Sequence, residues 1–337
     1  MRISRRALLA AAGALPLVGS RLARAADLPT IRVGWVVAGA NLTPTLFAKP
    51  GIAQHEGQTY RMEPVHFSGT PQMITALAAD ELDIGTLAYS SVALAIENAQ
   101  MADLRIIADE FQDGVPGYYT DEYMVLKDSP IKTVADLKGK VLATNGAGSA
   151  VDIALRAMLR QHGLDDQKDV TILEIGLPNM KAVLSEKKAD LICAVTPFSW
   201  DPALRSIART LFTQKEAVGR TQMLVWAARA GFLQQNRDAM DDFIADALRG
   251  RRFYIDPANH AEAVAIVAKA THQPPERFEG WLYTKKDYYR DPNGLPDLEA
   301  LQANIDLQAK LGFLKSGFKV GAYTDLSFAQ RAVQRLG

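Results

Sequence analysis

The segment Ser68–Gly85, SGTPQMITALAADELDIG, decides the fold of this chain of 337 residues. It follows an alternating strand pattern at Arg61–Phe67 and opens with small polar residues and Pro71, which suits the first turn of a helix. Apolar residues at helical spacing over Gln72–Ala79 then give way to a short apolar strand at Leu82–Leu87. This order predicts a unit of two strands joined by a helix.

The same alternation of strands and helices recurs through the first two thirds of the chain. We expect further strands at Ile31–Val37, Tyr123–Leu126, Lys140–Thr144, Val170–Glu174 and Asp190–Val195, and helices at Val134–Leu137, Val151–His162 and Met180–Lys187. After Ala227 the pattern is helical, with helices expected at Ala239–Tyr254, Ala261–Ala270, Glu276–Leu282 and Leu298–Leu314. Alternation of this kind builds mostly parallel sheets flanked by helices, so we predict an α/β fold.

The first 25 residues indicate an export signal. Arg5 and Arg6 precede an apolar run at Ala7–Val18, which is shorter than the roughly 20 residues of a membrane span, and small residues follow at Ala23–Ala25. This stretch holds five arginines and no acidic residue. We therefore predict a twin-arginine signal over residues 1–25 and a mature protein located in the periplasm. We do not expect a lipoprotein, because the single cysteine, Cys193, lies far from the predicted cleavage site.

Composition excludes several classes of partner and cofactor. The whole chain balances 38 Lys and Arg against 38 Asp and Glu, so the chain without its signal is acidic, and we expect neither nucleic acid nor a membrane surface as a partner. Cys193 lies in an apolar run, which favours a buried thiol. The five histidines show no metal-ligand spacing, and the glycines at 146 and 148 lack the rest of a nucleotide-binding motif. We expect no metal and no cofactor.

Three loops place small polar residues between the end of a strand and the start of a helix. They are Phe67–Gln72, Leu87–Ser91 and Ala143–Ser149. Free amides at a helix start attract an anion, and glycine lets a ligand approach the backbone closely. One such loop is ordinary turn chemistry, but three of them in an exported chain indicate a binding site for a small molecule.

Charged residues near the middle of the chain allow two interpretations. Asp109-Glu110 and Asp121-Glu122 are either solvated pairs or parts of an interdomain crossing with a role at a hinge or ligand. Arg220 and Gln222 either add charge to a ligand site or lie on a solvated strand edge, and we favour the solvated edge.

Several segments resemble one family of transport proteins. Ser68–Gly85 and Lys127–Val141 are similar to the corresponding segments of ABC-transporter solute-binding proteins of the nitrate, taurine and aliphatic-sulfonate family. Leu184–Ile192 with Thr196-Pro197-Phe198, and Gln308–Leu314, resemble the same family. The resemblance extends over essentially the whole mature chain. It implies a two-lobe periplasmic-binding-protein fold of type II, with a mostly parallel sheet in each lobe and the ligand cleft between the lobes.

The resemblance also implies how the chain is divided and how it works. Residues 26–111 and 227–337 would form lobe one, and residues 112–226 would form lobe two. The lobes would close on a small-molecule solute, and the closed form would be read by the transmembrane permease of the transporter. We expect a monomer, because binding proteins of this kind work singly.

The ligand-binding residues that the resemblance implies are small, polar or aromatic, and none is an arginine. They come from the end of the first strand, from the three loops and from the segment that follows the strand at Asp190–Val195. They are Trp35, Gly39, Asn41, Ser68, Gly69, Thr70, Tyr89, Ser90, Ser91, Thr144, Asn145, Gly146, Ser149, Thr196, Pro197 and Phe198. Such a set suits an aliphatic sulfonate, taurine or a nitrate-like anion. Its aromatic members, with Trp200, suit equally an aromatic carboxylate or sulfonate or a thiamine-type pyrimidine.

The sequence also allows functions other than transport. Pyrimidine synthases of the yeast type share the implied fold and are enzymes, but they carry a cysteine-rich, iron-dependent pattern that a single cysteine cannot reproduce. We therefore predict a protein that is not an enzyme and has no catalytic residues. A periplasmic enzyme of another kind, or a chemosensory protein whose closed form docks on a receptor, is the alternative.

Overall fold

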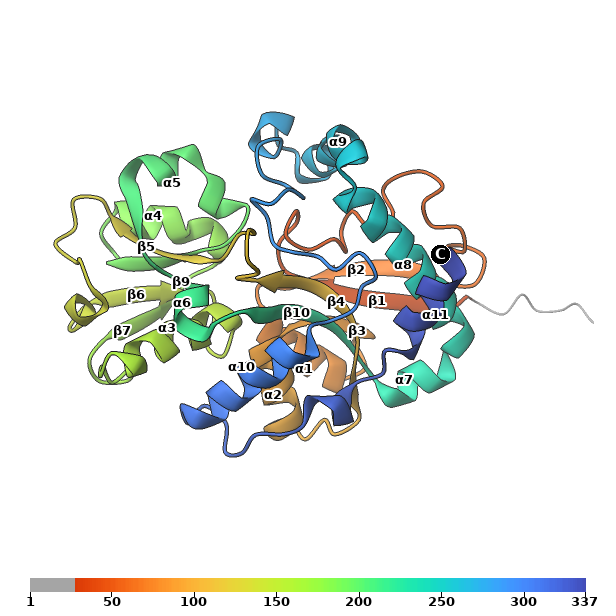
Figure 1. The fold of residues 1–337 in the computed structure, drawn as a ribbon, viewed down its shortest axis with the longest axis horizontal. Coiled ribbons are helices and arrows are strands. Elements are labelled where there is room, and N and C mark those ends of the chain that lie inside the picture. Colours follow the sequence, from red (N-terminus) through yellow and green to blue (C-terminus); the bar gives the residue numbers. More distant parts are fainter. Residues whose placement is uncertain (1–27) are drawn as a thin grey trace, which may run out of the picture.

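The computed structural model describes residues 28–337, so the predicted signal at residues 1–25 lies outside the described residues. Its strands form two separate five-stranded sheets, ordered β2-β1-β3-β10-β4 and β7-β6-β8-β5-β9 (Figure 1). The strands are β1 Thr30–Trp35, β2 Arg61–His66, β3 Ile84–Ala88, β4 Leu104–Asp113, β5 Glu122–Leu126, β6 Val141–Thr144, β7 Thr171–Glu174, β8 Leu191–Ala194, β9 Ala208–Thr213 and β10 Thr221–Arg229.

The two sheets share one pairing pattern. In the first sheet β1 pairs in parallel with β2 and β3, and β10 runs antiparallel to β3 and β4. In the second sheet β6 pairs in parallel with β7 and β8, and β5 runs antiparallel to β8 and β9. The α/β prediction is confirmed, with one strand of each sheet running against its neighbours.

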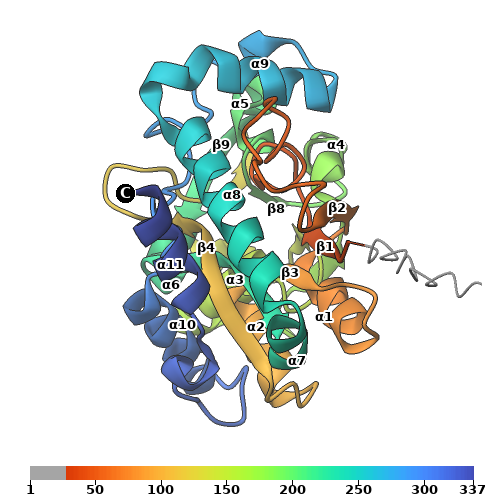
Figure 2. The same cartoon turned by 90° about the vertical axis from the view of Figure 1, so that its right-hand side faces the viewer.

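Helices cover both sheets. Figure 2 shows α8 running across one face of the first sheet with α11 beside it. The helices around the first sheet are α1 Thr70–Ala78, α2 Tyr89–Glu97, α7 Ala230–Gln235, α8 Arg237–Ile255, α9 His260–Thr271, α10 Leu298–Lys310 and α11 Ser327–Leu336. Those around the second sheet are α3 Ala150–Gln161, α4 Met180–Ser185, α5 Pro202–Ile207 and α6 Gln214–Val218. Short 3-10 helices are η1 Val134–Leu137, η2 Leu177–Asn179, η3 Phe198–Trp200, η4 Pro257–Asn259, η5 Pro275–Arg277 and η6 Val320–Tyr323.

Each sheet is held by its own aromatic packing. On the first sheet Phe243 of α8 stacks on Trp226 with ring centroids 5.6 Å apart and meets Tyr60 edge-on at 5.4 Å. On the second, Tyr123 of β5 stacks on Phe212 of β9 at 4.4 Å. Burying large rings in this way stabilises each sheet and its helices as a unit. None of the helices within residues 28–337 is long and apolar enough to cross a bilayer.

Two segments carry the chain between the sheets. The chain leaves the first sheet after β4 for β5, and it returns from β9 through α6 to β10. The predicted lobe boundaries at 111/112 and 226/227 fall within β4 and β10, and the division of the chain at these residues stays a prediction.

The structure differs from the sequence-based expectations mainly after residue 100. β4, β9 and β10 were not among the predicted strands. The helix expected at Glu276–Leu282 is wrong, because only the short η5 forms there and turns follow it. The helix expected at Leu298–Leu314 ends at Lys310.

Candidate functional site

Two adjoining cavities lie between the sheets. The inner pocket has a volume of about 70 Å³ and the outer chamber about 820 Å³, and both are lined by Val36, Val37 and Leu177. Val36 and Val37 directly follow β1, and Asn145, in the inner pocket, directly follows β6. The cavities therefore lie at the carboxyl ends of parallel strands, where open α/β sheets bind their ligands.

The inner pocket combines four polar side chains with apolar walls. The polar side chains are those of Asn41, Thr70, Asn145 and Ser149. Among the residues that the structure describes, its lining includes no acidic or basic side chain, and the apolar part of the lining is Val36, Val37, Ala40, Ala88, Phe111, Ala150, Val151, Leu177, Val195, Met223, Leu224 and Tyr288. The pocket is thus neutral, and one wall is formed by the stacked rings of Phe111 and Tyr288, 4.2 Å apart.

Two helices, one from each side of the cleft, begin at the inner pocket. Helix α1 begins at Thr70, and its N-cap residue Gly69 offers no side chain to its amides. Helix α3 follows Ser149, whose Oγ accepts a hydrogen bond from the Asp152 amide at 3.3 Å. The amides at the start of α1 have no side-chain cap, and the helix dipole makes both helix starts favourable for a negative charge. The arrangement can therefore hold a compact oxyanion without a cation.

Asn41 shapes the pocket rather than presenting a free amide. Its Oδ1 accepts from the Val36 and Val37 amides at 3.1 and 3.0 Å. Its Nδ2 donates to Glu110 Oε1 at 3.3 Å, and Glu110 also accepts from the indole of Trp226 at 2.6 Å. Fully buried Glu110 thus fixes the loop after β1 through Asn41.

The structure brings half of the predicted site residues to the cavities. Those that line a cavity are Trp35, Asn41, Ser68, Thr70, Asn145, Ser149, Pro197 and Phe198. Those that line neither cavity are Gly39, Gly69, Tyr89, Ser90, Ser91, Thr144, Gly146 and Thr196. Contact of any of them with a ligand stays a prediction.

Two of the residues behind the walls support the helix starts. Ser91 Oγ lies 2.7 Å from Thr70 Oγ1, and the Tyr89 hydroxyl donates to the Ala150 carbonyl at 3.3 Å across the cleft. A methyl group placed on Gly69 would stand 3.5 Å from Asn145 Nδ2. The two sides of the cleft are therefore in close contact around the inner pocket.

Several of the buried polar atoms that lack a hydrogen-bond partner in the described part of the chain lie near the cleft. They include Trp35 Nε1, Ser90 Oγ, Asn145 Oδ1, Thr196 Oγ1, Ser199 Oγ and Trp200 Nε1. Each such group costs about 1–3 kcal/mol unless it is paired. Three of these atoms, Trp35 Nε1, Asn145 Oδ1 and Trp200 Nε1, belong to residues that line a cavity, where a bound polar molecule would pair them.

The outer chamber is aromatic, with charges at its rim. Its rings are Trp35, His66, Phe198, Trp200, Phe278 and Trp281. Asp201 pairs with Lys181 at 2.6 Å, while Arg277 and Lys286 are exposed. The sequence analysis did not predict His66, Phe278 or Trp281 as site residues. The available signal was the pair of aromatic residues inside Glu276–Leu282, the segment wrongly predicted as a helix.

Acidic residues cluster in the crossing segments. Asp113 accepts from Thr120 Oγ1 at 2.6 Å and from the Asp121 amide at 2.7 Å, and Asp121 accepts from the Tyr288 hydroxyl at 2.5 Å. Burial raises the pKa of Asp113 to about 7 and raises the pKa of Asp121 well above its ordinary value.

Two interpretations of the charged residues are corrected here. Asp109, Glu110 and Asp121 are fully buried, so they are not solvated pairs. Gln222 is also fully buried and donates to Asp109 Oδ1 at 2.7 Å, so it does not lie on a solvated edge, whereas Arg220 pairs with Asp297 at 2.8 Å near the surface. The sequence had offered Asp109 and Glu110 a role at a hinge or ligand, but it did not show which contacts they make, because their partners are distant in sequence.

No group of three or more metal-ligating side chains occurs within residues 28–337. The thiol of Cys193 is buried in β8 and lines neither cavity, and burial raises its pKa. A buried thiol with a raised pKa is a poor nucleophile.

The paired sheets with a cleft between them have the type II fold of periplasmic binding proteins. The alkanesulfonate-binding protein SsuA from Xanthomonas axonopodis pv. citri, bound to MOPS, is 20% identical, with a TM-score of 0.68 over 89% of this chain and 99% of that chain. The desulfurization enzyme DszB, as a mutant in complex with biphenyl-2-sulfinic acid, is 13% identical, with a TM-score of 0.62 over 91% of this chain and 100% of that chain. At these identities the likeness is one of fold.

The family follows from the sequence comparisons. The model of the NMT1-like family matches residues 24–268, and the chain belongs to that family. A curated relative from Escherichia coli (strain K12), named "Putative aliphatic sulfonates-binding protein", is 30% identical over 156 residues. That match spans 46% of this chain and 46% of the relative, which is about half the length of each.

Proposed function

We propose that this chain is the periplasmic solute-binding component of an ABC importer and captures a small organic anion, such as an aliphatic sulfonate, taurine or nitrate. The observation that carries the proposal is the meeting of two helix starts, α1 at Thr70 and α3 after Ser149, at one neutral pocket between the sheets. Amides at helix starts hold an oxyanion without a counter-charge. The names of the Xanthomonas and Escherichia coli proteins support a sulfonate as the ligand class.

Capture and closure would be one event. A ligand that touches both sides of the cleft stabilises the closed arrangement and shifts the population toward it. The moving bodies would be residues 26–111 with 227–337, and residues 112–226. A monomer would then present its closed form to the permease.

Export would follow from the N-terminal sequence. Arg5 and Arg6 ahead of a short apolar run support twin-arginine export and removal of residues 1–25. Replacing both arginines by lysine should abolish periplasmic accumulation, as measured by cell fractionation, and unchanged accumulation would contradict this route.

We infer that the chain is not an enzyme, although DszB shares its fold. The cavities hold no cysteine among their described lining residues, and the acidic residues buried in the crossing segments line neither cavity. A binding protein returns its ligand unchanged, so recovery of the compound separates the two classes.

The test is calorimetric titration of the chain from residue 26 with ethanesulfonate, taurine and nitrate. We expect one compound to bind with one-to-one stoichiometry, to be recovered intact and, at about 100 times its dissociation constant, to stabilise the fold by about 2.7 kcal/mol. Consumption of the compound would identify an enzyme, and binding of none of the three would overturn the proposal.

A matched pair of variants locates the site. Ser149→Ala removes the cap of α3 and a hydroxyl in the pocket, while Thr213→Ala removes the cap of α6, which lines neither cavity. Both should lose about 1 kcal/mol of stability. Only Ser149→Ala should weaken anion binding, and equal affinities would place the ligand elsewhere.

A further inference from the structure

The outer chamber is much larger than a small alkyl anion needs. Its volume of about 820 Å³ lies within the range of about 300–1,000 Å³ that is typical of sites for drug-sized ligands. Taurine or nitrate seated at the helix starts would fill the inner pocket of about 70 Å³ and leave the chamber to water.

The side chains that the two cavities share are apolar. The residues that line both are Val36, Val37 and Leu177. A ligand that occupies both cavities would therefore place apolar atoms beside these residues, because a charge placed there would lose its hydration without gaining a partner. Its anionic group belongs at the helix starts in the inner pocket.

Aromatic side chains from both sides enclose the chamber. Trp35 lies at the end of β1, and its ring centroid is 4.5 Å from that of His66. Phe198 and Trp200 lie in η3, which follows β8 of the second sheet. Trp281 comes from the turn region after α9, with its centroid 6.0 Å from that of Phe278. Closure would bring these rings toward a bound group from opposite sides, and flat rings gain most from stacked or edge-on contact with a flat partner.

Among the described residues that line the outer chamber, every charged side chain is either exposed at its rim or paired. Glu276, Arg277 and Lys286 are exposed, and Asp201 is paired with Lys181. The charged side chains thus stay hydrated or paired. A ligand group inside the chamber would contact aromatic side chains.

We propose that the outer chamber holds a planar aromatic group, so that the solute is an aromatic ring joined by a short apolar linker to a sulfonate or carboxylate. This inference rests on the proposed function, since it places the anionic group at the same helix starts. It replaces the small alkyl anion by an aromatic one with the same head group.

The test compares ligands that share a head and a linker. By calorimetric titration, 2-phenylethanesulfonate should bind about 10- to 100-fold more tightly than ethanesulfonate, because burial of the ring adds to the same anionic contact. 2-Cyclohexylethanesulfonate should bind more weakly than the phenyl compound, and 3-phenylpropionate shows whether a carboxylate replaces the sulfonate. Equal affinity of the ethyl and phenyl sulfonates, or of the phenyl and cyclohexyl ones, would overturn the inference.

A matched pair of variants assigns the effect to the chamber. Phe198→Leu should lower the affinity for the phenyl compound about 5- to 10-fold more than the affinity for ethanesulfonate. Phe232→Leu, at a half-buried phenylalanine of α7 that lines neither cavity, should change neither affinity. An equal loss for both ligands in Phe198→Leu would contradict the inference while leaving the proposed function intact. Binding of no anion at all would overturn both.

Discussion

The cleft and the segments that cross between the sheets differ in their charged side chains. The inner pocket is lined by neutral side chains within the described part of the chain, and the chamber keeps its charges at the rim. The crossing region instead buries Asp109, Glu110, Asp113 and Asp121 completely. The lining of the inner pocket thus carries no charged side chain, while the region that joins the sheets buries several acidic ones.

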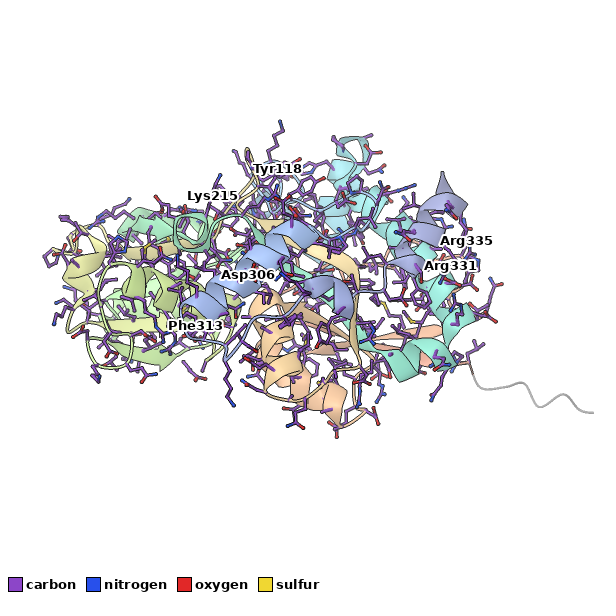
Figure 3. All side chains as sticks on the ribbon, turned by 60° about the horizontal axis from the view of Figure 1, so that its bottom comes forward. Tyr118, Lys215, Asp306, Phe313, Arg331 and Arg335 are labelled. Atoms are coloured by element: carbon purple, nitrogen blue, oxygen red, sulfur yellow. The ribbon has the colours of Figure 1, made fainter. Side chains whose placement is uncertain are left out.

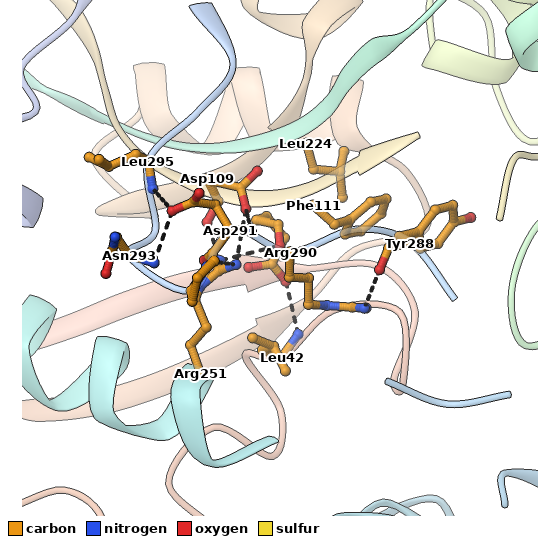
Figure 4. Close-up of polar contacts among 12 residues, drawn as sticks. Leu42, Asp109, Phe111, Leu224, Arg251, Tyr288, Arg290, Asp291, Asn293 and Leu295 are labelled. Atoms are coloured by element: carbon orange, nitrogen blue, oxygen red, sulfur yellow. Dashed lines mark hydrogen bonds and ion pairs between the residues drawn. The ribbon is translucent and has the colours of Figure 1, made fainter. Parts of the chain in front are cut away.

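Some of the buried acids in and around the crossing region are held by ion pairs. Arg251 of α8 bonds Asp109 Oδ2 at 3.0 Å and the Asp109 and Glu110 carbonyls, as the close-up in Figure 4 shows around Asp109. Arg290 pairs with Asp287 at 3.0 Å and donates to the Ala40 carbonyl at 2.7 Å. An ion pair of this kind offsets part of the cost of burying a charge. The difference suggests a division of roles. Buried ion pairs fix the segments between the sheets, and the shape and backbone amides of the pocket select the ligand.

The largest expected effect comes from breaking one of these pairs. Arg251→Met leaves the buried Asp109 carboxylate without its cation, so the free energy of unfolding in urea should fall by about 3–5 kcal/mol. Arg331→Met is the matched control, because Arg331 pairs with Asp241 at 2.6 Å with about a third of its side chain exposed, and it should cost at most about 1 kcal/mol. Similar losses in the two variants would show that the crossing charges are no more important than surface ones.

A smaller effect, with a definite sign, comes from the pair Asp113 and Asp121. Unfolded aspartates titrate near about 4. Since the pKa of folded Asp113 is raised to about 7 and that of Asp121 is also raised, the folded state binds more protons than the unfolded state between these values. The free energy of unfolding should therefore fall as the pH rises from about 4 to about 7. The charged neighbours Glu122 and Lys215 and the hydroxyl of Tyr288 act on the same pair.

Asp121→Asn tests this by removing one of the two buried charges. It keeps an acceptor for the Tyr288 hydroxyl and should raise stability at pH 8 by about 1–3 kcal/mol while flattening the pH dependence. Asp306→Asn, at an exposed position of α10 labelled in Figure 3, should retain the wild-type slope. Urea unfolding at pH 5 and pH 8 measures both, and an unchanged slope in Asp121→Asn would contradict the assignment.

The alternating halves of the fold could be predicted because their signals are local. Ser68, Thr70, Asn145 and Ser149 reached the cavities because each lies in a loop between a strand and a helix, and turn chemistry is readable from neighbouring residues. β4 was not predicted, since its sequence LRIIADEFQD mixes acids into a strand that is almost wholly buried. Asp109 is paired with Arg251 and Glu110 accepts a hydrogen bond from the Trp226 indole, both far away in sequence, and no local pattern shows those contacts.

The outer chamber could not be predicted from the sequence for a related reason. Phe278 and Trp281 meet Trp35 and Phe198 only through the tertiary fold. Helical spacing of apolar residues around Glu276–Leu282 resembled an amphipathic helix, but Pro274, Pro275 and Gly280 favour the turns that the structure has there.

The smallest expected effect concerns a second contact between the two sides, outside both the cleft and the crossing segments. Arg160 of α3 donates to the Leu311 carbonyl and lies 3.9 Å from the centre of the Phe313 ring, which Figure 3 labels beyond α10. Arg160→Gln should lower the free energy of unfolding by about 0.5–1 kcal/mol, since the side chain is partly exposed and its ion-pair partner Asp166 keeps Arg156 at 2.9 Å. Lys168→Gln, whose exposed partner is Asp165, should change nothing. A double-mutant cycle with Phe313→Leu isolates the coupling between the two side chains. Coupling near zero would leave the buried crossing charges as the polar contacts that set how firmly the sheets are joined, whereas coupling of about 0.5–1 kcal/mol would show that a surface cation shares that role.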